Sequence, residues 1–155
     1  MEDKIELVEF NKDNVEHIKY FKKLRDDKSI SIRFQGLFPY LLRKGDTIFN
    51  RGFFLSYQNE LVGYIDIGEF HEEEEAVYFR GAIDNEHRGK SLGKKMLKDV
   101  TEYVCNNYSY VKYIKLKIHK DNKPSINVAL SNGYKQVSDE LYILENPNYI
   151  KALTK

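Results

Sequence analysis

The chain has 155 residues, of which 25 are Lys or Arg and 24 are Asp or Glu, so its formal net charge is +1. This length is typical of one domain with one core, and the balanced charge argues against a dedicated nucleic-acid-binding protein, which usually has a strong basic excess. No apolar run approaches the roughly 20 residues that cross a bilayer, and the acidic, amphipathic N-terminus is unlike a signal peptide. We therefore expect a cytoplasmic protein without nucleic-acid or membrane partners.

The N-terminal third of the sequence predicts one strand followed by two helical regions. Residues 4–10 alternate apolar and polar side chains, as a strand does. Over residues 13–25 apolar side chains recur every three positions, which predicts a helix with Asn11 or Asp13 as its N-cap. A second, less regular helical pattern covers residues 30–43.

Three antiparallel strands are expected next. Residues 53–57 and 60–70 are rich in β-branched and aromatic side chains, and the two residues between them, 58–59, predict a tight hairpin. A third strand, residues 76–83, follows the acidic stretch 71–75, which we interpret as a solvated loop.

The C-terminal half alternates helices and strands. Residues 91–107 form the longest helical pattern, and the single cysteine, Cys105, lies on its apolar side, which predicts a buried structural thiol. The remaining elements are a strand, a short helix and two strands, over residues 111–119, 124–132, 134–138 and 140–144. This order indicates an α/β fold with a mixed sheet, in which the long helix connects two parallel strands with a right-handed crossover.

The most informative stretch is the turn between the third antiparallel strand and the long helix. Gly89 and Gly93 leave its backbone unobstructed, and its N–H groups, together with the helix dipole, can hold a diphosphate. Arg88, Lys90 and Lys94 add positive charge. From these residues alone, a tight turn with exposed lysines is an equally good interpretation, and the spacing is neither that of a P-loop nor that of a Rossmann turn.

Two segments in this half resemble signatures of the GCN5-related N-acetyltransferase (GNAT) family. Residues 88–93, RGKSLG, resemble the family's Arg/Gln-x-x-Gly-x-Gly/Ala motif, with Ser91 where the family most often has glycine. Further on, Asn122, residues 124–128 and the pair 133–134 resemble the second motif, which ends in Gly-Phe/Tyr.

The resemblance spans residues 53–144 and implies a GNAT fold. Such a fold has a mixed central sheet with antiparallel N-terminal strands, a splayed parallel pair and about four flanking helices. We expect a single acetyltransferase domain over residues 1–155.

The resemblance also implies an enzyme that transfers acetyl from its cosubstrate acetyl-CoA to a primary amine, by direct attack in a ternary complex and without a metal. The main chain at the end of the third antiparallel strand would bond the pantetheine arm and polarise the thioester carbonyl. For Asn122, a helix-capping role is an equally good interpretation. The residues expected to bind the cofactor are Gly81, Ala82, Ile83, Arg88, Gly89, Lys90, Ser91, Leu92, Gly93, Lys94 and Asn122.

The proton chemistry remains open at this point. Many family members have a tyrosine where this chain has Ala129, and the ribosomal-protein acetyltransferases have a glutamate where it has Lys117. The remaining catalytic candidates are Glu69, His119, Tyr134 and Tyr142, and a chain of water molecules would need none of them.

The acceptor is expected to contact Phe34, Phe38 and Tyr142. It could be a small-molecule amine, a protein N-terminus or a lysine side chain, and the resemblance also allows a homodimer. Because both standard proton carriers are missing, a non-catalytic acyl-CoA-binding or sensing module is the alternative function.

Overall fold

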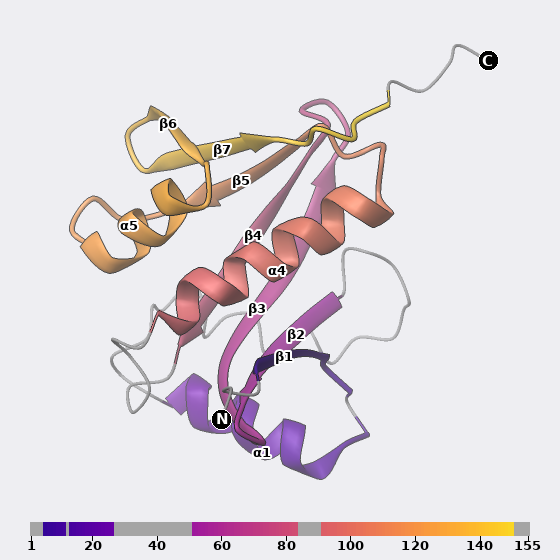
Figure 1. The fold of residues 1–155 in the computed structure, drawn as a ribbon, viewed down its shortest axis with the longest axis vertical. Coiled ribbons are helices and arrows are strands. Elements are labelled where there is room, and N and C mark those ends of the chain that lie inside the picture. Colours follow the sequence, from indigo (N-terminus) through magenta and orange to yellow (C-terminus); the bar gives the residue numbers. More distant parts are fainter. Residues whose placement is uncertain (1–4, 12, 27–50, 84–90, 151–155) are drawn as a thin grey trace.

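The computed structural model describes residues 5–11, 13–26, 51–83 and 91–150. Within these ranges, seven strands form one sheet and three helices pack against it (Figure 1). The strands are β1 (Ile5–Glu9), β2 (Arg51–Tyr57), β3 (Glu60–His71), β4 (Ala76–Ile83), β5 (Tyr113–Lys117), β6 (Lys135–Ser138) and β7 (Leu141–Glu145). The helices are α1 (Val15–Asp26), α4 (Leu92–Asn107) and α5 (Lys123–Ser131). None of these three helices is long and apolar enough to cross a membrane.

The strands follow the order β1-β2-β3-β4-β5-β7-β6 across the sheet. Only β4 and β5 are parallel, and all other neighbouring strands are antiparallel. The mixed α/β fold and the parallel pair joined through the long helix are therefore confirmed. The second helical region expected at residues 30–43, with Phe34 and Phe38, lies outside the described residues.

The hairpin between β2 and β3 turns through Gln58 and Asn59, as predicted. Both residues have a positive φ, of 52° and 68°. Two consecutive residues in this left-handed region match the right-handed twist of the flanking strands, and Asn tolerates the conformation well. The turn thereby fixes the register that pairs Tyr57 with Glu60.

The N-cap of α1 is Asn14, so the prediction of Asn11 or Asp13 was wrong. The Asn14 side-chain oxygen accepts hydrogen bonds from the backbone N–H groups of Glu16 (2.9 Å) and His17 (3.3 Å). Asn11 instead accepts from the Asp13 N–H at 2.9 Å, which makes a turn before the helix. Both asparagines suit either role by type, and only the position at which helical geometry begins decides between them.

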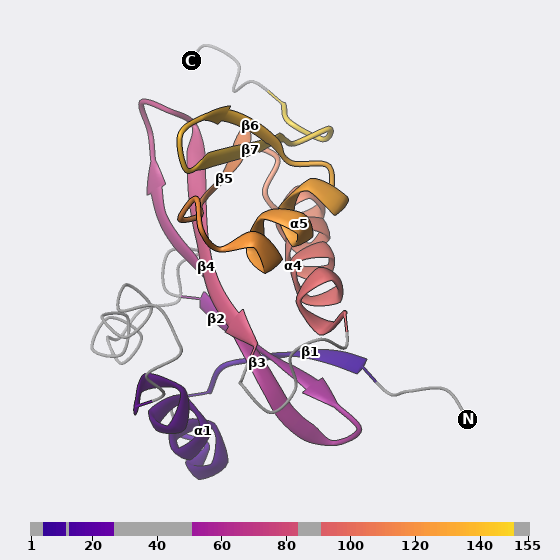
Figure 2. The same cartoon turned by 90° about the vertical axis from the view of Figure 1, so that its left-hand side faces the viewer.

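The two faces of the sheet are covered by different helices (Figure 2). Helices α4 and α5 pack on one face, where Ile65, Val77 and Phe79 join the larger core. Helix α1 packs on the other face, in a smaller cluster around Phe54 and Tyr64. The Cys105 side chain is 7% exposed in the larger core, which confirms a buried thiol.

Strands β4 and β5 are paired only where they begin, and they spread apart after that (Figure 1). Their ladder runs from Ala76–Tyr113 to Tyr78–Lys115, although β4 continues for five further residues. On its other side, β4 stays paired with β3 throughout, apart from a bulge in β3 opposite Tyr78. The expected splayed parallel pair is thus present.

The acidic turn between β3 and β4 fastens the closed end of this splay. Glu74 accepts hydrogen bonds from Lys115 Nζ (2.7 Å) and from the Tyr78 hydroxyl (2.9 Å), and these bonds lower the pKa of its carboxyl. The Glu75 carbonyl accepts from the N–H groups of Lys112 and Tyr113. The turn is largely exposed, as expected for a solvated loop, but part of it also joins the two parallel strands.

Candidate active site

Beyond Tyr78, the main chain of β4 is no longer paired with β5, because the two strands diverge. Gly81 lies in this stretch, opposite Ile65 of β3. A Cβ atom at Gly81 would lie 2.6 Å from the Tyr64 carbonyl oxygen and 3.0 Å from Ile65 Cβ. Since backbone cannot yield to such a contact, glycine is required for the β3–β4 approach here.

Helix α4 begins with a residue in the left-handed conformation. Ser91, its N-cap residue, has φ 61° and ψ 18°, and its side chain makes no capping hydrogen bond. This backbone conformation costs an L-residue about 1–2 kcal/mol, whereas glycine adopts it readily. The geometry explains why the family most often has glycine at a position where this chain has serine.

Gly93, in the first turn of α4, lies where the helix meets the end of β4 and α5. A Cβ atom there would be 3.6 Å from Ile83 Cγ1 and 3.6 Å from Val128 Cγ2, which are ordinary contacts. The N–H groups of Leu92, Gly93 and Lys94 belong to the first turn, where helical N–H groups have no intrahelical acceptor. The structure thus brings Gly81, Ile83 and the start of α4 to one end of the splay, whereas Arg88, Gly89 and Lys90 lie outside the described residues.

Asn122 is the N-cap of α5. Its side-chain oxygen accepts a hydrogen bond from the Ser125 N–H at 3.3 Å, and Pro124 occupies the first turn. Of the two roles considered for Asn122, the structure shows the capping one.

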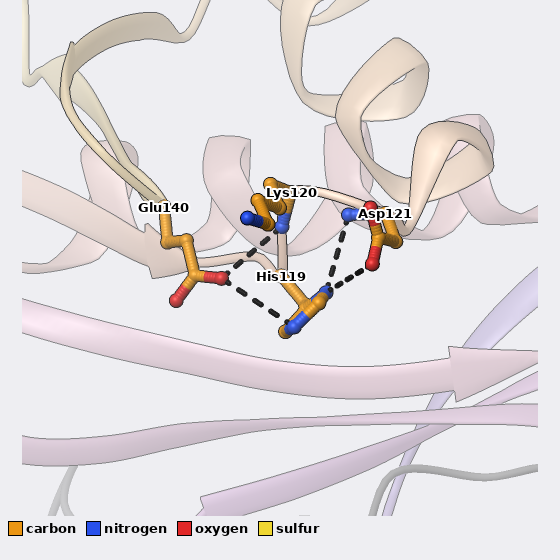
Figure 3. A network of polar contacts seen from close by, with 4 residues as sticks. All are labelled: His119, Lys120, Asp121 and Glu140. Atoms are coloured by element: carbon orange, nitrogen blue, oxygen red, sulfur yellow. Dashed lines mark hydrogen bonds and ion pairs between the residues drawn. The ribbon is translucent and has the colours of Figure 1, made fainter.

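His119 lies just beyond β5 in a polar network with Asp121 and Glu140 (Figure 3). Its Nδ1 accepts a hydrogen bond from the Asp121 N–H at 3.2 Å, and its Nε2 is 3.8 Å from Glu140 Oε2. In a neutral imidazole whose Nδ1 accepts, the proton is on Nε2. In the neutral form His119 therefore presents its Nε2–H toward Glu140, and both of its ring nitrogens face acidic residues.

The two tyrosine candidates lie in the larger core rather than at an open surface. Tyr134 is 2% exposed, and its hydroxyl is 2.8 Å from the Thr101 hydroxyl of α4; burial, the largest cause, strongly raises the pKa of Tyr134. Tyr142 is 3% exposed and pairs with Leu116 of β5. The side chain of Glu69 lies outside the described part of the structure.

The two positions that depart from the family pattern differ in their surroundings. Ala129, in α5, is 0% exposed and belongs to the larger core. Lys117 is exposed on the opposite face of the sheet, where its Nζ lies 5.3 Å from the centre of the Tyr78 ring. Neither position therefore has the tyrosine or the glutamate of the family pattern.

The most unusual polar group in the described residues is the Asp66 carboxylate of β3. Asp66 is 1% exposed, and neither of its oxygens has a hydrogen-bond partner of normal geometry among the described residues. Burial raises the pKa of Asp66 to about 7, and the charge and main chain of Arg80, opposite on β4, counter this only in part. The sequence analysis missed Asp66, although an aspartate between two isoleucines in a buried strand is a recognisable signal.

Asp66 lies on the sheet face away from α4. Ile65 and Ile67, on either side of it in β3, point into the α4 core, and Tyr64 belongs to the α1 cluster. Its neighbours across the sheet are Gly52 of β2 and Arg80.

Residues 8–134 match the family model described as the acetyltransferase (GNAT) family. This match covers most of the chain, and it agrees with the splayed strands and with the helix that starts beside them. The chain belongs to the GNAT family.

The spermine/spermidine N(1)-acetyltransferase of Bacillus subtilis (strain 168) is 36% identical over 93 residues. The match covers 56% of this chain, and the chain spans 60% of the length of this curated relative.

Solved structures with the same fold cover nearly all of the chain. Spermidine N-acetyltransferase from Vibrio cholerae, in complex with CoA and spermine, has a TM-score of 0.69 at 12% identity, over 94% of this chain and 97% of that one. RimL, a ribosomal L7/L12 alpha-N-protein acetyltransferase, has a TM-score of 0.65 at 15% identity, over 92% and 93% of the two chains. These similarities show the GNAT fold.

Replacing Ser91 with glycine should stabilise the protein. Glycine removes the strain of about 1–2 kcal/mol at φ 61°. It also raises the conformational entropy of the unfolded chain, which lowers stability by about 0.4–1 kcal/mol, so we expect a net gain of about 0.5–1 kcal/mol in the free energy of unfolding. Urea denaturation followed by circular dichroism measures it. Ser91→Ala is the matched control and should change little, because the serine side chain makes no capping bond; equal stability of the two variants would contradict the strain.

Replacing Asp66 with asparagine should change the pH dependence of stability. The folded pKa of about 7 is above the value of about 4 in an unfolded chain, so Asp66 destabilises the fold progressively as pH rises from about 4 to 7 and fully above that. Relative to wild type, Asp66→Asn should therefore gain about 2–3 kcal/mol in free energy of unfolding between pH 5 and pH 8. Denaturation at both pH values tests this, and a pH-independent difference would show that Asp66 titrates normally.

Proposed function

We propose that this protein transfers the acetyl group of acetyl-CoA to a primary amine of a small polyamine. The divergence of β4 from β5 beyond Tyr78, beside the first turn of α4, supports the proposal most directly. All seven described strands share one sheet, which supports a single acetyltransferase domain over residues 1–155.

The cofactor would be held mainly by main-chain groups. The pantetheine arm would add to β4 like a short strand at residues 81–83, in the space left by β5. The N–H groups of residues 89–94, with the positive end of the α4 dipole and the charges of Arg88, Lys90 and Lys94, would bind the pyrophosphate. Ser91 fits this role because its backbone has a left-handed conformation, which glycine adopts readily, and its N–H group remains available.

A polyamine is the acceptor that the comparisons favour. The Bacillus subtilis relative is named a spermine/spermidine N(1)-acetyltransferase, and the Vibrio cholerae structure contains CoA and spermine. By its name, RimL acetylates a protein N-terminus. Its identity to this chain is only 15%, so its similar fold does not indicate which acceptor this chain uses.

The proton steps would depend on water more than on one side chain. The attacking amine must lose a proton, and the departing thiolate must gain one. His119 has its Nδ1 engaged with Asp121, and Tyr134 has its hydroxyl buried against Thr101. A chain of water molecules in the splay would carry both protons without either residue.

Substitutions at Gly93 test the cofactor site. Gly93→Ala places a Cβ atom at ordinary contact distance from Ile83 and Val128 and should leave CoA binding nearly unchanged. Gly93→Phe should extend a ring between the end of β4 and α5 and weaken binding by about 100-fold or more, equivalent to about 3 kcal/mol. Calorimetric titration with coenzyme A measures both variants, and circular dichroism verifies that they fold. Equal affinity of the two variants would contradict a cofactor site at this end of the splay.

An amine panel tests acetyl transfer itself. The protein is mixed with acetyl-CoA and with spermidine, 1,4-diaminobutane, butylamine or a peptide with a free N-terminus, and released CoA is read with a thiol reagent. The only protein thiol, Cys105, is buried and should contribute little signal. We expect the polyamines to give the fastest release. Tight CoA binding without release for any amine would favour the acyl-CoA-sensing alternative.

A further inference from the structure

We propose that Asp66 determines acceptor specificity by binding a second ammonium group of the amine whose first amino group is acetylated. The inference rests on the proposed function and adds the residue that would select diamines and polyamines over monoamines.

The first support is the condition of the carboxylate. Asp66 is buried, neither of its oxygens has a hydrogen-bond partner of normal geometry among the described residues, and the main chain of Arg80 compensates only in part. A buried carboxylate without a partner is costly to the fold, and native structures rarely keep one without a function. Arg80 is the charged residue across from it on β4, but the Arg80 side chain is exposed. An ammonium ion would supply the missing hydrogen-bond donors and the opposite charge.

The second support is the face of the sheet on which Asp66 lies. Helices α4 and α5 pack on the other face and close the splay from that side (Figure 2). An acceptor that approaches from the other face would enter on the side that carries Asp66. Because Asp66 is 1% exposed, its second ammonium would have to enter the sheet face beside β3 to reach the carboxylate, one strand away from the open stretch of β4.

The third support is distance. Under the proposed function the thioester lies beside Gly81, on the flank of β4 turned away from β3. Asp66 lies on β3, opposite Arg80 of β4. One strand spacing separates β3 from β4 and a second separates β4 from the thioester, so Asp66 is about 10 Å from the acetyl carbon. This is too far for Asp66 to take a proton directly from the attacking nitrogen, which needs contact at about 3 Å.

The same distance suits a second ammonium. An attacking nitrogen about 3 Å from the acetyl carbon and an ammonium about 3 Å from the carboxylate leave about 4–7 Å between the two nitrogens. A spacer of three or four methylene groups covers that length, as in the aminopropyl and aminobutyl arms of small polyamines.

Paired amines test the inference, because 1,4-diaminobutane and butylamine differ only in the second amino group. We expect wild type to have a KM for 1,4-diaminobutane about tenfold or more below that for butylamine. Asp66→Asn should raise the diamine KM by a similar factor and leave the KM values for butylamine and acetyl-CoA within about twofold. Asp99→Asn, at an acidic residue of α4 paired with Lys95, is the matched control and should leave the KM values for both amines unchanged.

Calorimetric titration of 1,4-diaminobutane into the CoA complex gives a readout that does not depend on turnover. We expect binding by wild type and by Asp99→Asn, and at least about tenfold weaker binding by Asp66→Asn. Equal effects of Asp66→Asn on both amines, or none on either, would overturn the inference. If wild type acetylates both amines equally well, the proposed function stands and the inference fails. If it binds the diamine but acetylates no amine, the proposed function fails and the binding role of Asp66 is judged by the titration alone.

Discussion

The site depends on one constraint, namely that β4 and β5 are paired at one end and not at the other. Three residue pairs hold the closed end, and the acidic turn reinforces it through Glu74 and Lys115. Beyond Tyr78, β4 keeps its ladder with β3, so it remains a straight, ordered strand while β5 turns toward β7. A strand that is fully ordered yet bonded on one side offers main-chain groups to a ligand at little cost in ordering entropy.

Packing at the open end fixes the geometry around this stretch. Gly81 permits β3 to approach β4 closely, and α4 begins with Gly93 facing Ile83 and Val128 at ordinary contact distance. The helix N-terminus therefore points its first N–H groups toward the same end at which the strands separate. The structure achieves this with a strained residue at Ser91, so the orientation of the helix start is maintained at a small cost in stability.

Much of this could be predicted from the sequence because the signals were local. Apolar periodicity located every strand and helix that the structure describes, and the Gln58-Asn59 turn specified the hairpin. The αL conformation at Ser91 was not predicted, because serine itself rarely adopts it, although the resemblance to a motif that most often has glycine there was a signal for it. The cap of α1 was misplaced between neighbouring asparagines of equal propensity. The contacts of Tyr134 with Thr101 and of His119 with Glu140 join segments far apart in the sequence, which no local pattern encodes, whereas the two isoleucines beside Asp66 did signal its burial.

The same distinction separates the cofactor from the acceptor. A cofactor held by backbone N–H and C=O groups depends on chain geometry, so its site follows from glycines, a strand end and a helix start, all of which leave marks in the sequence. An acceptor recognised by charge would depend on a single side chain, and the role of that side chain follows from its burial and not from its residue type. Asp66 is one of 24 acidic residues; its two isoleucine neighbours indicate burial, but only the structure shows that neither oxygen has a partner of normal geometry among the described residues. Under the proposed role of Asp66, one substitution on this face would change acceptor specificity while the cofactor site stays intact, because the two sites are built from different parts of the chain.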